Sequence, residues 1–327
     1  MAGLLNVNEL EVRFGLRQGA VTALRDINFS LQAGERLGVV GESGAGKSVL
    51  GFAILNLIAK PGYIAAGEVQ FEGQNLAAMS QEALRTIRGN RVAMIFQDPM
   101  MTLNPVLTIG EQMVECLHAH RKLSKAAARR VAVDKLKLVQ IPSPETRIDQ
   151  YPHELSGGMR QRVVIAIALL LDPVLIIADE PTTALDVTIQ AEIMLLMRKL
   201  CEDHNVALML ITHDLGVVAE VTQRTMVMYA GRIIEEGPTR SLIEHAQHPY
   251  TRGLINALPQ MTQPGQLLNQ IPGSMPSLQK IPSGCAFNPR CEHAQALCRE
   301  ELPSLQVQGD SRVACHWVAG RLQEQVA

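Results

Sequence analysis

The chain has 327 residues, of which 47% are hydrophobic and 19% are charged, and its formal net charge is −2. This length suits one large α/β domain with an appendage, or two domains, and the hydrophobic content is ample for a packed core. The charge gives no electrostatic case for a nucleic-acid partner, because such proteins usually show a basic stripe. The first residues lack the basic start of a secretory signal, and no apolar run approaches the length of a membrane span, about 18 residues, so neither is expected.

The first hundred residues read mainly as strands. Apolar and polar residues alternate in the first two segments, as in half-buried strands, and the third is short and apolar. We predict strands at residues 4–14, 21–31, 35–40, 68–71 and 91–96.

A glycine-rich loop follows the third strand. Residues 41–48 read GESGAGKS and fit the G-x-x-x-x-G-K-[ST] phosphate loop. Its glycines let backbone N–H groups turn inward to form an anion-binding nest. A helix predicted at residues 48–58 would point its positive N-terminal end at the phosphates. Lys47 would then reach the β- and γ-phosphates, and the Ser48 hydroxyl would bind Mg²⁺.

The middle of the chain changes character. The region from about residue 98 to residue 171 carries helical patterns, and we interpret it as a helical subdomain inserted into an α/β core. Apolar strands and a helix then alternate, which indicates parallel strands with helical crossovers. The predicted helices span residues 109–120, 124–138, 163–171 and 187–201, and the predicted strands span residues 174–178, 207–211, 225–229 and 232–234.

Polar residues at the ends of these strands suggest catalysis. Asp179 and Glu180 end an apolar strand, where Asp179 suits a Mg²⁺ shell and Glu180 could polarise an attacking water. Gln97 could reach the same Mg²⁺ and water, and His213 could sense the γ-phosphate. Alone, such residues are more often structural, but here they follow a phosphate loop. Residues 155–161 (LSGGMRQ) supply a second anion site at a helix start.

With these motifs in this order, the chain resembles an ATP-binding cassette (ABC) ATPase over roughly residues 4 to 255. The resemblance includes Phe14 at the adenine-stacking position and the loop Ala184-Leu185-Asp186. It implies an α/β P-loop NTPase with a RecA-like core, an antiparallel β subdomain and the inserted helical subdomain. It also implies a head-to-tail dimer that encloses two ATP molecules, in which residues 155–161 (the signature) of one subunit serve the ATP of the other.

The motifs and the resemblance together predict the site residues. Glu180, His213 and Gln97 form the expected catalytic set, and Mg²⁺ is expected on Ser48 and Gln97. The residues expected to hold ATP are Phe14, Gly41, Glu42, Ser43, Gly44, Ala45, Gly46, Lys47, Ser48, Val49, Asp179, Ser156, Gly157 and Gly158.

A narrower resemblance covers nearly the whole chain. Residues 96–100 (FQDPM), 103–105 (LNP) and 248–251 (HPYT), with a cysteine-bearing tail, look like the ATPase subunit of dipeptide and oligopeptide importers. The sister branch that imports nickel is similar. We therefore interpret the chain as the ATP-hydrolysing subunit that energises peptide import. The alternatives are the ATPase of a nickel or other small-solute importer, and a soluble non-transport ABC ATPase. Proteins of that last class usually carry two cassettes or a long coiled-coil insertion.

This interpretation implies partners and a location. We expect a second ABC ATPase subunit (a paralogue is favoured), two membrane permease subunits and, indirectly, a periplasmic or extracellular peptide-binding protein. The chain would lie peripherally on the cytoplasmic face of the inner membrane. Residues 1–258 are expected to form the ATPase domain, and residues 259–327 an extension in which Pro, Gly and Gln increase.

Four of the six cysteines lie in this extension. Cys285, Cys291, Cys298 and Cys315 are separated by five, six and sixteen residues. Zinc thiolate sites usually contain closer pairs, while wider spacing can suit a cubane cluster, so spacing alone does not decide. Some of the peptide-importer ATPases that the chain resembles hold a [4Fe-4S] cluster in this tail, which favours a structural cluster over Zn²⁺. Cys116 and Cys201 lie in helical patterns and are expected to be buried.

Overall fold

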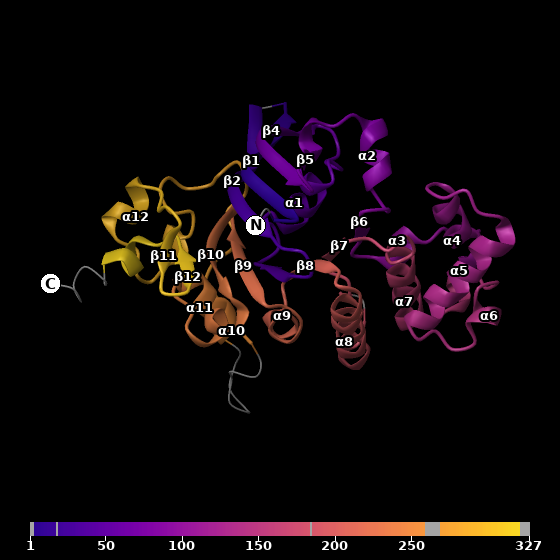
Figure 1. Cartoon of the computed structure of the whole chain (residues 1–327). Helices are drawn as coiled ribbons and strands as arrows, with labels where there is room; N and C mark the ends of the chain where they lie inside the picture. Colours follow the sequence, from indigo (N-terminus) through magenta and orange to yellow (C-terminus); the bar gives the residue numbers. More distant parts are fainter. Residues whose placement is uncertain (1–2, 18, 184, 259–268, 321–327) are drawn as a thin grey trace. The chain divides into compact units, whose positions relative to one another are not determined.

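The computed structural model describes residues 3–17, 19–183, 185–258 and 269–320 (Figure 1). The chain divides into two compact units. Unit 1 comprises residues 1–31, 36–77 and 211–327, and unit 2 comprises residues 32–35 and 78–210.

Unit 1 begins with a four-stranded antiparallel sheet in the order β2-β1-β4-β5. Its strands are β1 (Leu5–Leu16), β2 (Gly19–Leu31), β4 (Gly62–Phe71) and β5 (Gln74–Asn75). The alternating pattern correctly predicted β1 and β2. It found only residues 68–71 of β4, because Gly62 and Gly67 (φ 86°) interrupt the earlier part of the strand, which is mostly exposed.

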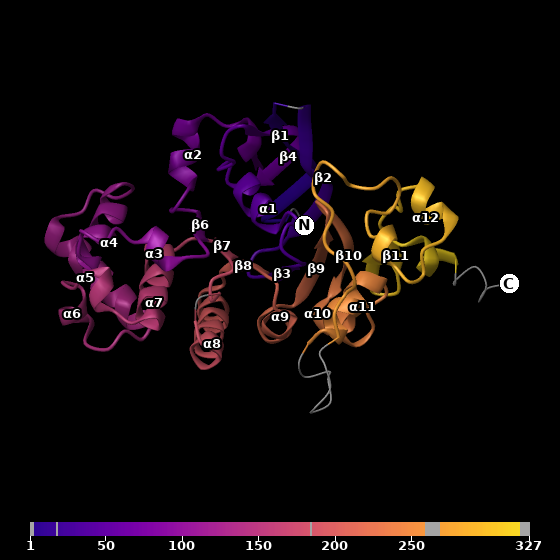
Figure 2. The same ribbon diagram turned by 180° about the vertical axis from the view of Figure 1, so that it is seen from behind.

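A second set of strands in unit 1 follows the order β11-β12-β10-β9-β3. β3 (Arg36–Val40) is parallel to β9 (Arg224–Tyr229), which pairs antiparallel with β10 (Arg232–Pro238). From the C-terminal part of the chain, the hairpin of β11 (Gln306–Gln308) and β12 (Ser311–Val313) joins this set, because β12 pairs with β10 (labelled in Figure 1; Figure 2 gives the view from behind). The helices of unit 1 are α1 (Lys47–Ile54), α9 (Leu215–Val221), α10 (Thr239–Glu244), α11 (Pro249–Asn256) and α12 (Ala296–Glu300).

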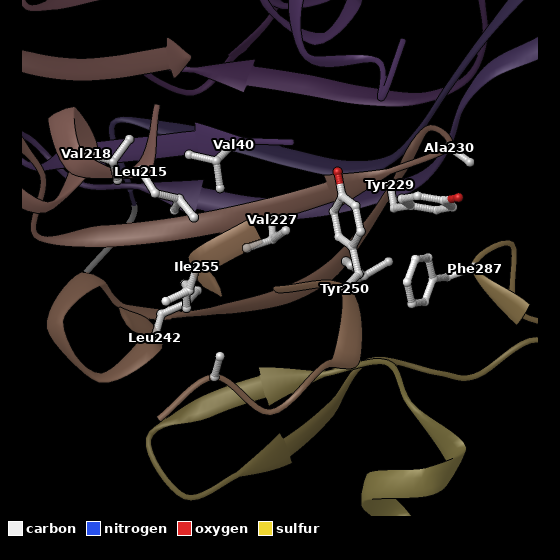
Figure 3. Close-up of a cluster of buried hydrophobic side chains, with 12 residues drawn as sticks. Val40, Leu215, Val218, Val227, Tyr229, Ala230, Leu242, Tyr250, Ile255 and Phe287 are labelled. Atoms are coloured by element: carbon white, nitrogen blue, oxygen red, sulfur yellow. The ribbon is translucent and has the colours of Figure 1, made fainter. Parts of the chain in front are cut away.

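One hydrophobic cluster of unit 1 joins distant parts of the sequence (Figure 3). Val40 at the end of β3, Tyr229 at the end of β9 and Tyr250 of α11 are all at most 1% exposed. Phe287 from the C-terminal part of the chain lies edge-on to both tyrosine rings, with centroid distances of 5.3 and 5.4 Å. The C-terminal residues therefore share a core with the strand that leads into the phosphate loop.

Unit 2 combines buried strands in the order β8-β7-β6 with several helices. β7 (Leu175–Asp179) is parallel to β6 (Val92–Ile95), and β7 and β8 (Ala207–Thr212) are buried along their whole length, as expected for central strands. At the end of β8 the chain passes into unit 1. The helices are α2 (Gln81–Ile87), α3 (Pro99–Thr102), α4 (Ile109–His118), α5 (Lys125–Leu138), α6 (Pro144–Arg147), α7 (Gly157–Ala168) and α8 (Val187–His204).

Polar caps fix where the longer helices of unit 2 begin. Thr108 and Glu111 form a capping box at α4, Ser124 caps α5 and Asp186 caps α8. α4 packs on α5, and α5 and α3 pack on α7. This helical group matches the predicted helical region.

The predicted α/β architecture, with an antiparallel β region and a helical region, is confirmed. The helix after the phosphate loop is shorter than predicted and ends at Ile54, since Asn56 adopts a left-handed φ of 50°. The predicted domain boundary at residues 258 and 259 touches a segment outside the described residues, and that division stays a prediction.

Candidate functional site

The phosphate loop, residues 41–48, connects β3 to α1 in unit 1. Gly44 and Gly46 have φ values of 85° and 102°, which side chains other than glycine rarely adopt. A Cβ on Gly46 would lie 2.9 Å from the Leu24 side chain and 3.3 Å from the Ala23 carbonyl oxygen. Both the conformation and the space around Gly46 therefore require glycine.

Lys47 is only 5% exposed. Its Nζ donates to the carbonyl oxygens of Gly41 at 2.8 Å and Glu42 at 3.0 Å, so the loop closes around its own lysine. α1 begins after Gly46, which makes no side-chain cap hydrogen bond to the start of the helix. This buried cation and the helix N-terminus give the loop the chemistry of a phosphate site. Ser43 and Ala45 lie within the loop, and Ser48 and Val49 lie in the first turn of α1.

The loop also contacts two residues that were not among the predicted site residues. The hydroxyl of Tyr250 accepts a hydrogen bond from the backbone N–H of Glu42 at 2.8 Å. The guanidinium of Arg290 donates to both carboxylate oxygens of Glu42, at 2.7 and 3.0 Å. Nothing in the local sequence indicates these contacts, because Arg290 lies 248 positions away from Glu42.

In unit 2, the acidic strand end is arranged around Glu180. Asp179 ends the buried strand β7 and is 4% exposed, and Glu180 follows with a left-handed φ of 45°. The Gln97 amide donates to Glu180 Oε2 at 3.1 Å, and the Thr183 hydroxyl donates to the same oxygen at 2.8 Å. The structure thus brings two predicted residues together and adds Thr183. Such a doubly held carboxylate can orient a water molecule.

The signature, residues 155–161, also lies in unit 2. Ser156 caps α7, and its hydroxyl accepts from the backbone N–H of Met159 at 3.3 Å. Gly157 is exposed, and a Cβ there would meet the Leu185 side chain at an ordinary 3.5 Å. A Cβ on Gly158 would lie 2.8 Å from Ile189, so packing against α8 explains Gly158 but does not explain Gly157. Ala184, in the loop before Leu185, lies outside the described residues.

Two further predicted residues lie in unit 1. His213 follows β8 and is exposed, and the neighbouring Asp214 caps α9 by accepting from the backbone N–H of Gly216 at 2.8 Å. Phe14 lies half-buried on β1 opposite Gly62, with its ring close enough to leave no room for a Cβ there. Their predicted roles stay predictions.

The four clustered cysteines lie in the C-terminal module, which we define as residues 269–320. The backbone N–H of Cys285 donates to the carbonyl of Cys298 at 2.8 Å. Burial raises the pKa of Cys285 to about 11 and also raises the pKa values of Cys291 and Cys315, and neighbouring thiols raise them further. In the part of the chain that the structure describes, no group of three or more His, Cys, Asp or Glu side chains is placed to hold a metal ion.

The arrangement of the four thiols therefore does not support the predicted [4Fe-4S] cluster or the Zn²⁺ alternative. The physical reason is that ligation requires several thiols gathered around one centre, and among the described residues the side chains do not form such a group. Of the other two cysteines, Cys201 in α8 is buried, as predicted, and Cys116 in α4 is partly buried.

No helix in the described ranges combines the length and the apolar character needed to cross a membrane.

Comparisons with known proteins identify two family models and several relatives that match this chain. Residues 24–183 match the family model described as ABC transporter, and residues 234–298 match the one described as oligopeptide/dipeptide transporter, C-terminal region. The chain is 49% identical over 300 residues to the oligopeptide transport ATP-binding protein OppD of Salmonella typhimurium, covering 92% of this chain and 89% of that protein. It is 47% identical over 315 residues to the dipeptide transport ATP-binding protein DppD of Escherichia coli, covering 96% of each.

A solved structure is also similar. The dimeric post-hydrolysis state of the ATP-binding cassette MJ0796, bound to ADP and Pi, has a TM-score of 0.65 and 28% identity. The matched region covers 72% of this chain and 99% of the MJ0796 chain.

Proposed function

The chain belongs to the family of ABC transporter ATP-binding proteins, and from this premise we propose that it is the ATP-hydrolysing subunit of an oligopeptide or dipeptide importer. Two features support the peptide substrate: the match of residues 234–298 to the oligopeptide/dipeptide transporter C-terminal region, and relatives that are named as oligopeptide and dipeptide transport proteins.

The phosphate loop would bind the nucleotide. Lys47 would leave the carbonyl oxygens of Gly41 and Glu42 for the β- and γ-phosphates, and the N–H groups at the start of α1 would bind phosphate oxygens. Mg²⁺ would neutralise phosphate charge, and Ser48 and Gln97 are the residues that would hold it. Phe14 would stack on the adenine.

The main support for a role in hydrolysis is the pair of hydrogen bonds that Gln97 and Thr183 donate to Glu180 Oε2. We assign to Glu180 the orientation of the attacking water. The bond from the water oxygen to the γ-phosphorus would form as the bond to the ADP oxygen breaks, and the water would give its proton to the carboxylate. His213 would report the state of the γ-phosphate.

The signature would act on the nucleotide of a partner subunit. The exposed Gly157 and the helix start at Ser156 leave backbone groups of α7 accessible, which supports this role. We therefore propose a head-to-tail dimer with a second ATPase subunit, a paralogue being favoured. The pair would dock on two membrane permease subunits at the cytoplasmic face of the inner membrane. A periplasmic or extracellular binding protein would deliver the peptide.

The test uses Glu180→Gln in the full chain, with the exposed Glu202→Gln of α8 as the matched control. Glutamine can still accept from Gln97 and Thr183 but cannot take a proton, so we expect ATP binding to persist and hydrolysis to fall about a hundredfold or more. A closed, ATP-bound dimer should accumulate in size-exclusion chromatography. Near-normal hydrolysis by Glu180→Gln, with Glu202→Gln unchanged, would remove Glu180 from the mechanism.

We also propose that the four cysteines of the C-terminal module hold a structural iron–sulfur cluster. Support comes from the fold of the module, in which the backbone N–H of Cys285 donates to the carbonyl of Cys298 at 2.8 Å and holds two of the four cysteines together. The side chains would have to turn towards one centre. Anaerobically purified protein should contain about four irons per chain. Stoichiometric zinc without iron, or no metal, would refute the cluster.

A further inference from the structure

Glu42 connects the phosphate loop to the C-terminal module. It is the second residue of the loop, and its carboxylate accepts a two-pronged pair of hydrogen bonds from Arg290, which lies between Cys285 and Cys291 of the module. The carbonyl of Glu42 accepts from Lys47 Nζ at 3.0 Å, and its N–H donates to the Tyr250 hydroxyl. One loop residue therefore contacts both the phosphate-binding lysine and the module.

Arg290 is held more firmly than a surface arginine. Its side chain is 5% exposed, while that of Glu42 is 32% exposed. The guanidinium also donates to the backbone carbonyls of Pro272, at 2.7 Å, and Ile271, at 3.3 Å. Its hydrogen bonds to Glu42 raise the pKa of Arg290 above its usual value. A buried, multiply bonded arginine fixes the carboxylate that it faces, because the planar guanidinium sets distance and direction together.

Packing around this ion pair also joins the loop to the module. The Arg290 guanidinium carbon lies 5.9 Å from the ring centre of Tyr229 and 5.8 Å from that of Phe287. These rings and Tyr250 converge from separate parts of unit 1 in the cluster of Figure 3. Met275 of the module lies within van der Waals contact of the space beside Gly44. The module thus surrounds one side of the phosphate loop.

We propose that Arg290 is a positioning residue for ATP binding, through which the folded C-terminal module sets the conformation of the phosphate loop. The guanidinium holds the Glu42 side chain, and the Glu42 backbone in turn holds the carbonyl that orients Lys47 and the N–H bonded to Tyr250. Loss of the module's structure would release Glu42 and lower the affinity for nucleotide. This inference rests on the proposed ATP site at residues 41–48.

The experiment measures the Kd for MgATP and the steady-state KM and kcat of the full chain. Arg290→Met should raise both Kd and KM for ATP about tenfold, while kcat at saturating ATP changes less than twofold. Arg290→Lys, which keeps the charge but not the fork, should recover part of the affinity. The matched control is Arg299→Met, which removes an exposed arginine of the same module and should bind ATP normally.

Glu42→Gln tests the other side of the pair and decides the outcome if Arg290→Met does not fold. It should weaken ATP binding like Arg290→Met, and the double variant should be no weaker than the weaker single variant, since both remove one interaction. Wild-type affinity in Glu42→Gln and in any folded Arg290→Met would overturn the proposal. If Lys47→Ala still binds ATP normally, the proposed nucleotide site itself has failed.

A second pair of variants tests whether the structure of the C-terminal module affects ATP binding at the phosphate loop. Gly284 and Gly309 have similar left-handed φ values, 67° and 64°. A Cβ on Gly284 would lie 2.4 Å from the Cys298 carbonyl oxygen, whereas one on Gly309 would meet nothing within 4 Å. Gly284→Ala should therefore weaken ATP binding more than Gly309→Ala, although neither residue belongs to the loop. Equal affinities in two folded variants would show that the module's structure does not reach the loop.

Discussion

The starts of α1 and α7 are both glycine-rich helix N-termini, yet they are built differently. α1 begins at Gly46, in a left-handed conformation, without a side-chain cap, and next to a buried lysine. α7 begins at Ser156, whose own hydroxyl caps the helix, and its first glycine is exposed. The fold needs Gly46, but nothing within its own unit needs Gly157. Local packing therefore explains the glycine of the first helix start, whereas for the second we propose the nucleotide of a partner subunit as the reason.

The largest expected effect concerns the cation at the first helix start. Lys47→Ala should weaken ATP binding about a hundredfold, because charge-assisted hydrogen bonds to phosphate contribute about 1.5–3 kcal/mol each. Isothermal titration calorimetry would measure this loss. If instead Lys47→Ala kept its affinity while a charge change at Gly157 abolished it, the roles assigned to the two helix starts would be reversed.

Alanine substitutions at Gly46 and Gly157 should have different effects on the free energy of unfolding. Gly46→Ala should lower the free energy of unfolding by about 2 kcal/mol, since it combines left-handed strain with crowding against Leu24. Gly157→Ala should cost nothing, because Gly157 is helical and its Cβ would meet only an ordinary contact. Urea denaturation of both variants gives the comparison. Equal losses would contradict the view that only the first glycine is required by the fold.

Low pH should destabilise the fold near the first helix start, where Tyr250 contacts the phosphate loop. His248 is 1% exposed next to Tyr250, and burial lowers its pKa to about 3. His248 is therefore protonated at a lower pH in the native state than in the unfolded state, where its pKa is about 6.5. Because the unfolded state binds the proton more readily, the free energy of unfolding falls as the pH drops from about 6.5 towards 3. At pH 5 the loss should be about 2 kcal/mol.

The control for this pH effect is His248→Asn, which can still accept the Tyr250 N–H that His248 Nδ1 accepts at 3.0 Å. The variant should lose less stability than the wild type between pH 7 and pH 5. Burial raises the pKa of Glu235, which acts in the opposite direction, but both proteins retain Glu235, so the difference between them isolates the histidine. Parallel pH profiles for the two proteins would exclude His248 as the source.

The smallest expected effect lies at the second helix start. Gly157→Asp should leave ATP binding to the same chain and its stability unchanged, and should lower dimer turnover about tenfold, because a carboxylate would face the phosphate of a partner's nucleotide. Gly157→Ala adds a side chain without a charge and serves as the control. Loss of the variant's own ATP affinity would place the signature in its own site and end the comparison.

Most of the architecture could be predicted because its signals are local. Alternation identified β1 and β2, continuous apolar runs identified β7 and β8, and helical patterns identified α4 and α5. Short elements such as α10, α12 and the hairpin of β11 and β12 escaped prediction, since a few residues carry too little periodicity.

The candidate site divides in the same way. The phosphate loop and the acidic strand end were found because backbone geometry and metal chemistry demand particular residues at fixed spacing. Thr183 was missed, although it holds Glu180 as closely as Gln97 does, because one hydroxyl three residues along a loop has no distinctive pattern. The cysteine cluster was read from spacing and resemblance, and the arrangement of the side chains did not support it.

By itself the sequence determined the phosphate loop, the buried strands, the helical region and the order of the motifs, because each depends on neighbours within a few residues. Only the tertiary structure decided that Arg290 and Tyr250 hold Glu42, and that Phe287 packs against Tyr229. Those pairings depend on how the C-terminal module packs against the other parts of unit 1. No local propensity records a contact between residues that lie up to 248 positions apart.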